Sequence, residues 1–526
     1  MANKSLFKSL IGKLSAKTDA FDAAGGVAYA MSPRQALAQY AATGCLNSTF
    51  YADADEQLET IIGLAAKVEP EFLARVALYA RSKAHMKDAP ALLVALLSVR
   101  SPGLMAEVFD RVIDSPRMLR TFVQVMRSGV VGRKSLGTLP KRLVLQWIAS
   151  RSDDQLFRAS LGAAPSLADI VRLVHPKPAT PARAALLGYI VRKPYDHNAL
   201  PAVVTAFEGF KTMLPSCPEA QLPDVPMEML TSLPLTKAHW TALARKASWQ
   251  SLRMNLNTFA RHSVFVDGPD VITEVAAKLR DANAIARARV FPYQLLAAFM
   301  NIGDGVPPEI RDALQDAMEI AIGNVPSVSG KVWVFPDVSG SMQAPVTGRR
   351  TGASSAVRCI DVAALVAASI VRKNPGAGVL PFSDSVVDVS PKLNPRDSVM
   401  TNAQRLASLP SGGTNCAAPL EYLNQRKLSG DLLIYVSDNE SWLTSAGALG
   451  RSTATLAQWQ VFKARNPRAK LVCLDVQPNS TTQAPDQPDV LNVGGFADAV
   501  FNVISEFNNG TLGTDHWVSV IEKELI

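Results

Sequence analysis

The segment KVWVFPDVSGSM spans residues 331–342 and marks the point at which the rhythm of the chain changes. Its β-branched and aromatic run, 332–335, is typical of a short strand, and a polar turn follows it. Strand-like runs recur downstream as GVLPFS (378–383), DLLIYVSD (431–438) and KLVCLDV (470–476), with helix-like stretches between them. Strands that alternate with helices in this way predict a parallel, doubly wound α/β domain, to which we assign residues 329–526.

Oxygen-bearing side chains stand at the ends of two of these runs. Asp337, Ser339 and Ser341 alternate in the turn after the first strand, so a carboxylate and two hydroxyls can converge on one point. Thr414 lies in the glycine-rich loop SGGTN, and Asp438 ends the run LLIYVSD. Ligands bind beyond the carboxyl ends of parallel strands, and hard oxygen ligands suit Mg²⁺ or Mn²⁺. The pattern therefore predicts a divalent-cation site, unless these oxygens only hydrogen-bond the loops to one another.

The preceding part of the chain has a helical rhythm. From about residue 33 to 320, apolar residues recur three and four apart in segments such as EQLETIIGLAAKV (56–68) and EFLARVALYARSK (71–83), with proline and glycine at the breaks. Short helices in series predict antiparallel pairs stacked as a HEAT-like solenoid over residues 33–328. Because no strict period is visible, an irregular helical bundle remains an alternative. Residues 1–32 are expected to be an N-terminal extension.

Positive charge is concentrated in the helical part. The net charge is +8, yet residues 331–526 hold 17 basic and 17 acidic side chains, so the whole excess lies in residues 1–330. Residues 115–195 alone carry 14 Lys and Arg against three acidic residues. Such a block predicts a surface that attracts polyanions and binds phosphate backbones in a salt-dependent manner. A solvated basic face without a partner is the alternative.

Several function classes lack their sequence signatures. The chain has no GxxxxGK[ST] phosphate loop, no HExxH and no convincing GxSxG, and its six histidines do not cluster. We therefore expect a protein that is not an enzyme. The five cysteines are scattered without CxxC spacing, and no secretory signal or run of 18 to 20 apolar residues is visible. These features favour a cytoplasmic protein.

At this point the chain resembles a known family. The stretches that carry the resemblance, from about residue 35 to 505, include TGCLNSTFYADADEQLETII (43–62), HMKDAPALLVALLS (85–98), SGVVGRKSLGTLPKRLVLQWI (128–148) and LADIVRLVHPKP (167–178). Together with the polar turns they resemble the Ro autoantigen family, whose RNA-binding TROVE module precedes a von Willebrand A domain, and they are nearer its bacterial members. Residues 510–526 match nothing in that family.

The resemblance implies roles for the polar turns. In von Willebrand A domains the metal-ion-dependent adhesion site has the same order of elements. By that resemblance Asp337, Ser339 and Ser341 would coordinate the cation, most simply Mg²⁺, directly. Thr414 and Asp438 would bind it directly or through water. Such sites leave one coordination position for an acidic group of a partner.

The resemblance also implies the partners of the helical domain. Family members look like a ring of helical repeats that is closed by the A domain. Small structured Y-type RNA binds the outer basic surface of this ring. Single-stranded ends of misfolded RNA enter a central hole, and an exoribonuclease or another RNA-processing enzyme can be recruited to what is expected to be a monomer. Residue by residue, this implies RNA contacts at Arg133, Lys134, Lys141, Arg142, Arg158, Arg172, His175 and Lys177.

Other interpretations of these residues stay open. Arg172 can pack its stem on a helix surface, and His175, which precedes a proline, can be an ordinary loop residue. The competing function is that of a protein-binding or chaperone-associated A-domain module that binds no RNA. If reversal of the charges of Lys141 and Arg142 left every partner interaction intact, this second function would be favoured.

Overall fold

The computed structural model describes residues 16–526 except 45, 163–164, 218, 267, 289–291, 326, 328–329, 350–356, 442–451, 498 and 513–514. The chain forms two compact units. Among the described residues, the first unit, which we call the sheet unit, comprises 16–89, 292–297 and 318–525. The second, the helical unit, comprises those of 90–288 and 298–317, with the last residue, Ile526. The domain boundary between residues 328 and 329 is placed where the helical pattern of the sequence gives way to alternating strands and helices. It stays a prediction, because the two compact units are divided at other positions.

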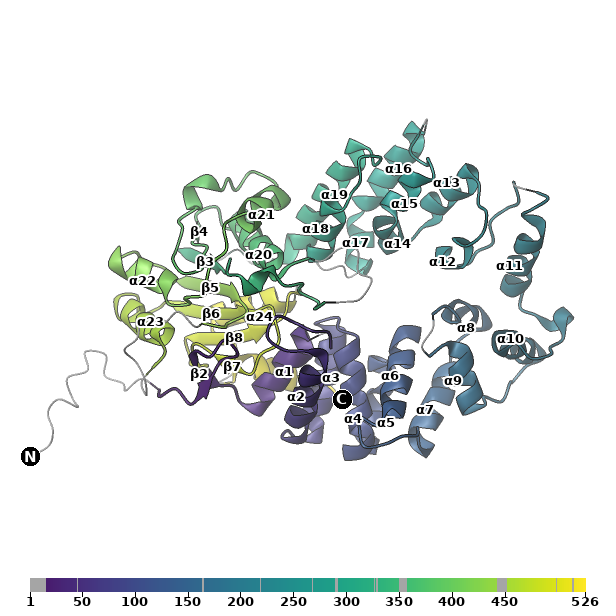
Figure 1. The fold of residues 1–526 in the computed structure, drawn as a ribbon, viewed down its shortest axis with the longest axis horizontal. Coiled ribbons are helices and arrows are strands. Elements are labelled where there is room, and N and C mark those ends of the chain that lie inside the picture. The colour runs from purple at the N-terminus through teal and green to yellow at the C-terminus, as the bar shows by residue number, and fades with distance from the viewer. Residues whose placement is uncertain are drawn as a thin grey trace, which may run out of the picture. The chain divides into compact units, whose positions relative to one another are not determined.

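The sheet unit is built on a five-stranded sheet in which all neighbouring strands are parallel (Figure 1). The strand order is β4 (Gly378–Val379), β3 (Val332–Pro336), β5 (Leu432–Ser437), β6 (Lys470–Asp475) and β8 (Val490–Gly494). The strands alternate along the chain with α20 (Cys359–Lys373), α21 (Val399–Ala407), α22 (Ala418–Gln425), α23 (Ala454–Arg465) and α24 (Ala499–Asn509). The expected doubly wound α/β fold is confirmed.

One face of this sheet carries a large apolar cluster. Trp333 and Phe335 of β3 stand directly opposite Leu433 and Tyr435 of β5, so the side chains of all four point to the same face. They pack in one buried cluster with residues of α22 and α23, including Trp459. Helix α20 packs on β3 and β5 outside this cluster. With both faces covered, strands β3 and β5 are fully buried, and β5 is apolar up to its last residue, Ser437.

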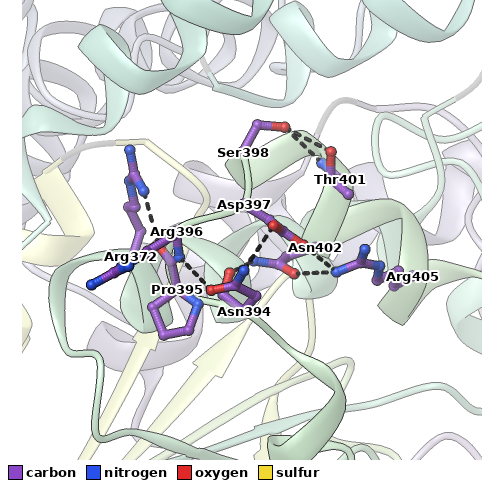
Figure 2. Close-up of polar contacts among 9 residues, drawn as sticks. All are labelled: Arg372, Asn394, Pro395, Arg396, Asp397, Ser398, Thr401, Asn402 and Arg405. Atoms are coloured by element: carbon purple, nitrogen blue, oxygen red, sulfur yellow. Dashed lines mark hydrogen bonds and ion pairs between the residues drawn. The ribbon is translucent and has the colours of Figure 1, made fainter.

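The short segment that leads into α21, residues 394–398, is held by polar contacts (Figure 2). Arg372 of α20 donates to the carbonyl of Pro395 at 2.9 Å, and the amide of Asn402 in α21 donates to the carbonyl of Asn394 at 2.8 Å. Ser398 caps α21 by accepting from the backbone N–H of Thr401 at 3.2 Å. These bonds fix the entry to α21, which packs along α20 beside the sheet.

The N-terminal part of the chain belongs to the sheet unit. Strand β2 (Val27–Ala30) pairs with β1 (Ala20–Phe21) and with β7 (Thr481–Thr482), so 20–30 is an ordered hairpin that extends the α/β domain. Helices α1 (Pro33–Thr43), α2 (Ala54–Ala66) and α3 (Pro70–Ser82) follow it.

The unmatched tail also has a place in this unit. Its helix α25 (His516–Glu522) packs on α1 and α3, and the indole N–H of Trp517 donates to the hydroxyl of Tyr79 at 3.0 Å. Both aromatic residues are buried. Helix α25 therefore packs the C-terminal part of the chain against helices near its beginning.

The helical unit is all-α over its described residues, as the apolar periodicity predicts. Proline occupies the first turn of α5 (Pro102–Val112), α6 (Pro116–Ser128), α10 (Pro181–Val191) and α16 (Pro269–Leu279), where its missing N–H costs no hydrogen bond. The division between the units falls within α4 (Asp88–Arg100), α18 (Pro292–Met300) and α19 (Pro308–Ala321). The other helices are α5 (Pro102–Val112), α6 (Pro116–Ser128), α7 (Thr138–Ala149), α8 (Asp153–Ala159), α9 (Leu167–Val174), α10 (Pro181–Val191), α11 (Ala202–Met213), α12 (Met227–Leu230), α13 (Lys237–Lys246), α14 (Trp249–Met254), α15 (Leu256–Arg261), α16 (Pro269–Leu279) and α17 (Ala282–Ala288). None of the helices that the structure describes is long and apolar enough to span a lipid bilayer.

Candidate functional site

Two neighbouring parallel strands place the predicted metal ligands side by side. Pro336 at the end of β3 stands opposite Val436 of β5, and the chain then continues into Asp337 on one strand and to Asp438 on the other. The backbone N–H of Asp337 donates to the carbonyl of Val436 at 3.0 Å, which holds the first turn against the second strand. Both carboxyl groups thus lie at the carboxyl edge of the sheet, as expected for a ligand site in this architecture.

The oxygen atoms of the first turn converge. The carboxylate of Asp337 accepts from the hydroxyl of Ser437 at 2.6 Å and from the backbone N–H of Ser339 at 2.8 Å. The hydroxyl oxygens of Ser339 and Ser341 lie 3.2 Å apart. All four residues are buried, so these oxygens face one another in a site that is largely removed from bulk water.

The loop that carries Thr414 lies against this turn. The backbone N–H of Gly340 donates to the carbonyl of Gly412 at 2.9 Å, two residues before Thr414, which is itself buried. The site therefore gathers elements from three separate stretches of sequence. The five residues predicted as ligands lie on these three elements, and their binding of a metal stays a prediction.

The electrostatics of the site fit a bound cation. Burial raises the pKa of Asp438 to about 7, and the negative charge of Asp337 contributes to the rise; burial likewise raises the pKa of Asp337. Two buried carboxylates that repel each other are stabilised by a divalent ion placed between them. Over the described ranges no group of three or more His, Cys, Asp or Glu side chains forms a metal cluster, so the ligand set here would be two carboxylates completed by hydroxyls. That set suits Mg²⁺ rather than Zn²⁺.

A residue that the sequence reasoning missed stands at the mouth of this site. The hydroxyl of Tyr51 hydrogen-bonds Ser341, and burial followed by the charge of Asp438 raises the pKa of Tyr51. Tyr51, Ser341 and Asp438 line a cavity of about 230 Å³ together with Phe50 and Asn479. Tyr51 lies in a stretch quoted above for its resemblance, but no local pattern connects it with a turn almost 300 residues later.

The N-terminal hairpin is locked onto the same loop. Glu440 accepts from the backbone N–H of Ala23 at 2.6 Å, while Asp22 accepts from the backbone N–H of Ser441 at 2.9 Å. Gly26 fits closely against this loop, since an added Cβ would lie 1.9 Å from the carbonyl oxygen of Ser441. Burial, with the charges of Asp22 and Asp438, raises the pKa of Glu440 to about 8. The reciprocal bonds hold the segment after Asp438 in place.

The predicted RNA contacts lie in the helical unit on and around α7, α8 and α9, and they fall into two groups. Five of them make no ion pair with any residue in the described ranges: Lys134, Lys141, Arg142, His175 and Lys177. All are exposed except Lys141, which is half-buried. His175 ends α9 with φ +52°, and its backbone N–H donates to the carbonyl of Val171 at 2.9 Å, so its ring is free to face solvent.

The other three are already used within the fold. Arg133 donates to the carbonyl of Ser98 at 3.0 Å, and Arg172 donates to the carbonyl of Val191 at 2.8 Å. Arg158 bridges Asp154 at 2.9 Å and Asp224 at 3.0 Å. Bonds of this kind hold the guanidinium groups in place and reduce the charge available to a ligand. An RNA contact at these three positions stays a prediction.

Comparison with known proteins agrees with this arrangement. Residues 331–508 match the family model for the Ro60 von Willebrand A domain. Over 518 residues the chain is 26% identical to the RNA-binding protein RO60 of Deinococcus radiodurans, covering 93% of this chain and 94% of that protein. The crystal structure of the Deinococcus radiodurans RO (RSR) protein superposes with a TM-score of 0.62 at 23% identity, covering 91% of this chain and all of that one. Residues 331–508 therefore resemble a von Willebrand A domain of the Ro60 type, and the expected resemblance of the chain to the Ro family is confirmed.

Proposed function

We propose that this protein is a non-catalytic, RNA-binding scaffold. The observation that carries the proposal is a group of five cationic and histidine side chains in the helical unit that form no ion pair with a described residue. The chain also resembles an RNA-binding relative over most of its length. We call this group, Lys134, Lys141, Arg142, His175 and Lys177, the basic surface. Lysine and arginine side chains that form no ion pair within the fold can bind phosphate oxygens without first breaking such a pair.

The RNA on the basic surface is proposed to be a small structured, Y-type RNA. Phosphate contacts position such an RNA without fixing its sequence, and His175 can hydrogen-bond a phosphate or contact a base. Single-stranded ends of misfolded RNA are proposed to enter a central hole of the helical repeats. The protein would act as a cytoplasmic monomer in RNA quality control or processing and present its RNA to an exoribonuclease or another processing enzyme.

The A domain is proposed to bind Mg²⁺ and, through it, a partner. Asp337, Ser339 and Ser341 would hold the ion directly, with Thr414 and Asp438 direct or water-mediated ligands. The ion would supply a Lewis-acidic position for a carboxylate of a partner protein. The chain's own residues serve this by fixing the ligand turn: Ser437 orients the carboxylate of Asp337, and the bond between Gly340 and Gly412 seats the loop that carries Thr414.

Electrophoretic mobility shift with the full chain tests the proposal. The probe is a stem-loop RNA of about 80 nucleotides with a single-stranded 3′ end, and the control is the same RNA with the Lys141→Glu/Arg142→Glu variant. We expect a discrete complex with the wild-type chain that the variant fails to form. Equal binding by the two proteins, or none by either, would refute the assignment of the basic surface.

A further inference from the structure

A cavity opens beside the charged residues of the basic surface. It measures about 560 Å³ and lies within the helical unit between α7 and α9. Leu136, Leu145 and Leu173 form its apolar wall, and Lys141 and Arg142 stand at its edge. Leu145 and Leu173 are half-buried, so they present apolar surface to solvent in the most basic block of the chain. The cavity is shallow and open to solvent, so it can receive part of a longer ligand.

The wall and the edge of this cavity call for different chemistry. The leucines offer no hydrogen-bonding side-chain atom, so what they cover must be apolar or must present a flat face. Lys141 and Arg142 form no ion pair with the residues that the structure describes, so the group at the edge must be anionic. A chain that repeats an anionic group and a flat, weakly polar ring at each unit satisfies both requirements. Single-stranded nucleic acid is such a chain.

A second cavity supports this geometry. It measures about 500 Å³, shares Leu145 with the first, and continues along α7 toward α10. Its wall is apolar through Ile148 and Leu187, and Lys177 of the basic surface lies on it. Its one acidic side chain, Asp153, is neutralised by an ion pair with Arg183. An anionic strand therefore meets no unpaired negative charge among the side chains that line either cavity.

We infer that the cavity between α7 and α9 binds an unstacked nucleobase of RNA, with the neighbouring phosphates on Lys141 and Arg142. The inference rests on the proposed RNA-binding function and deepens it. It replaces recognition by charge alone with recognition of charge and base together. Because the wall is aliphatic, the site accepts different bases with little discrimination and distinguishes nucleic acid from other polyanions.

Two fluorescent oligonucleotides of equal charge test the inference. One is a 12-nucleotide single-stranded RNA, and the other has the same backbone with abasic ribose at every position. Fluorescence anisotropy with the full chain at one fixed salt concentration gives the two dissociation constants. We expect the abasic strand to bind about five- to tenfold more weakly, the change expected for a loss of about 40–60 Å² of buried apolar surface.

Variants locate the effect. Leu145→Gln and Leu173→Gln should weaken binding of the intact strand by a similar factor and leave that of the abasic strand unchanged. Lys141→Gln should weaken both strands equally. Leu200→Gln is the matched control, because Leu200 is also half-buried in the helical unit but lines neither cavity. Equal binding of the two strands by the wild-type chain overturns the inference while leaving RNA binding intact. If neither strand binds, the proposed function itself fails. If an acidic peptide with apolar residues binds the cavity and displaces no RNA, the site is a protein-docking site and the inference is wrong.

Discussion

Removal of two charges from the basic surface should change how RNA affinity responds to salt. The double variant is Lys141→Gln/Arg142→Gln. It should leave α7 intact, because Arg142 is exposed, Lys141 is only half-buried, and neither forms an ion pair with a described residue. The basic surface of the wild-type chain has four permanently charged side chains: Lys134, Lys141, Arg142 and Lys177. If each neutralises one phosphate, the logarithm of the association constant falls with the logarithm of salt with a slope of about −3 to −4.

The magnitude follows from counterion release. Between 50 and 200 mM salt the wild-type chain should lose about 50- to 150-fold in affinity, whereas the double variant with two contacts should lose only about 7- to 12-fold. At 0.1 M salt the variant should bind about 25- to 60-fold more weakly than the wild-type chain. Fluorescence anisotropy over a salt series measures both quantities.

A matched variant provides the control. The variant Arg158→Gln/Arg172→Gln also removes two positive charges from this region. In the fold, however, the guanidinium group of Arg158 bonds Asp154 and Asp224, and that of Arg172 bonds the carbonyl of Val191. We expect it to leave the salt slope nearly unchanged and to lower the free energy of unfolding by about 0–1 kcal/mol for each exposed ion pair. An unchanged slope for the Lys141/Arg142 variant, or an equal drop for both variants, would refute the reasoning.

Three further predictions concern the sheet unit. Addition of Mg²⁺ at a hundredfold excess over its dissociation constant should stabilise the chain by about 2.7 kcal/mol, chelation should reverse the gain, and Asp337→Asn should abolish it; calorimetric melting measures this, and an undiminished gain in the variant would exclude the site. Trp517→Ala should cost about 3–5 kcal/mol, while Trp517→Phe, which keeps most of the packing and loses the bond to Tyr79, should cost about 1 kcal/mol; urea unfolding distinguishes them, and equal losses would show that packing is not the main contribution. Burial raises the pKa of Asp475 well above its usual range, so the folded state holds this proton more tightly than the unfolded state, and stability falls as pH rises above about 4. Asp475→Asn keeps an acceptor for the amide of Gln39, 2.9 Å from Asp475, and should flatten this fall between pH 4 and 8. An unchanged slope of stability against pH would assign the dependence to other groups.

Local patterns were enough to predict the architecture of the α/β domain. The apolar run at 332–335 and its counterpart in LLIYVSD are fully buried parallel strands, so continuous apolar character was a sufficient signal. Asp337 and Asp438 could be placed together because the carboxyl ends of parallel strands lie at one edge of a sheet. The helical rhythm before residue 320 was equally visible, since amphipathic spacing depends only on near neighbours.

What could not be predicted depends on contacts between distant parts of the chain. The pairing of β2 with β7 and the packing of α25 on α3 join segments more than 400 residues apart, and no periodicity encodes such contacts. The contact between Tyr51 and Ser341 could not be predicted for the same reason. The basic block predicted the positive charge of the surface, but not which of its side chains form ion pairs within the fold. The ion pair of Arg158 with Asp154 follows from helical spacing, whereas its second partner, Asp224, lies far away in the sequence.

The most direct test of the central claim is to isolate the full chain from its native cells in mild salt and sequence the nucleic acid that accompanies it. We expect a discrete small structured RNA that is lost when Lys141, Arg142 and His175 are replaced together. Recovery of no RNA above that of a control protein of similar charge would contradict the account, and the basic surface would then be a solvated face of a protein-binding module.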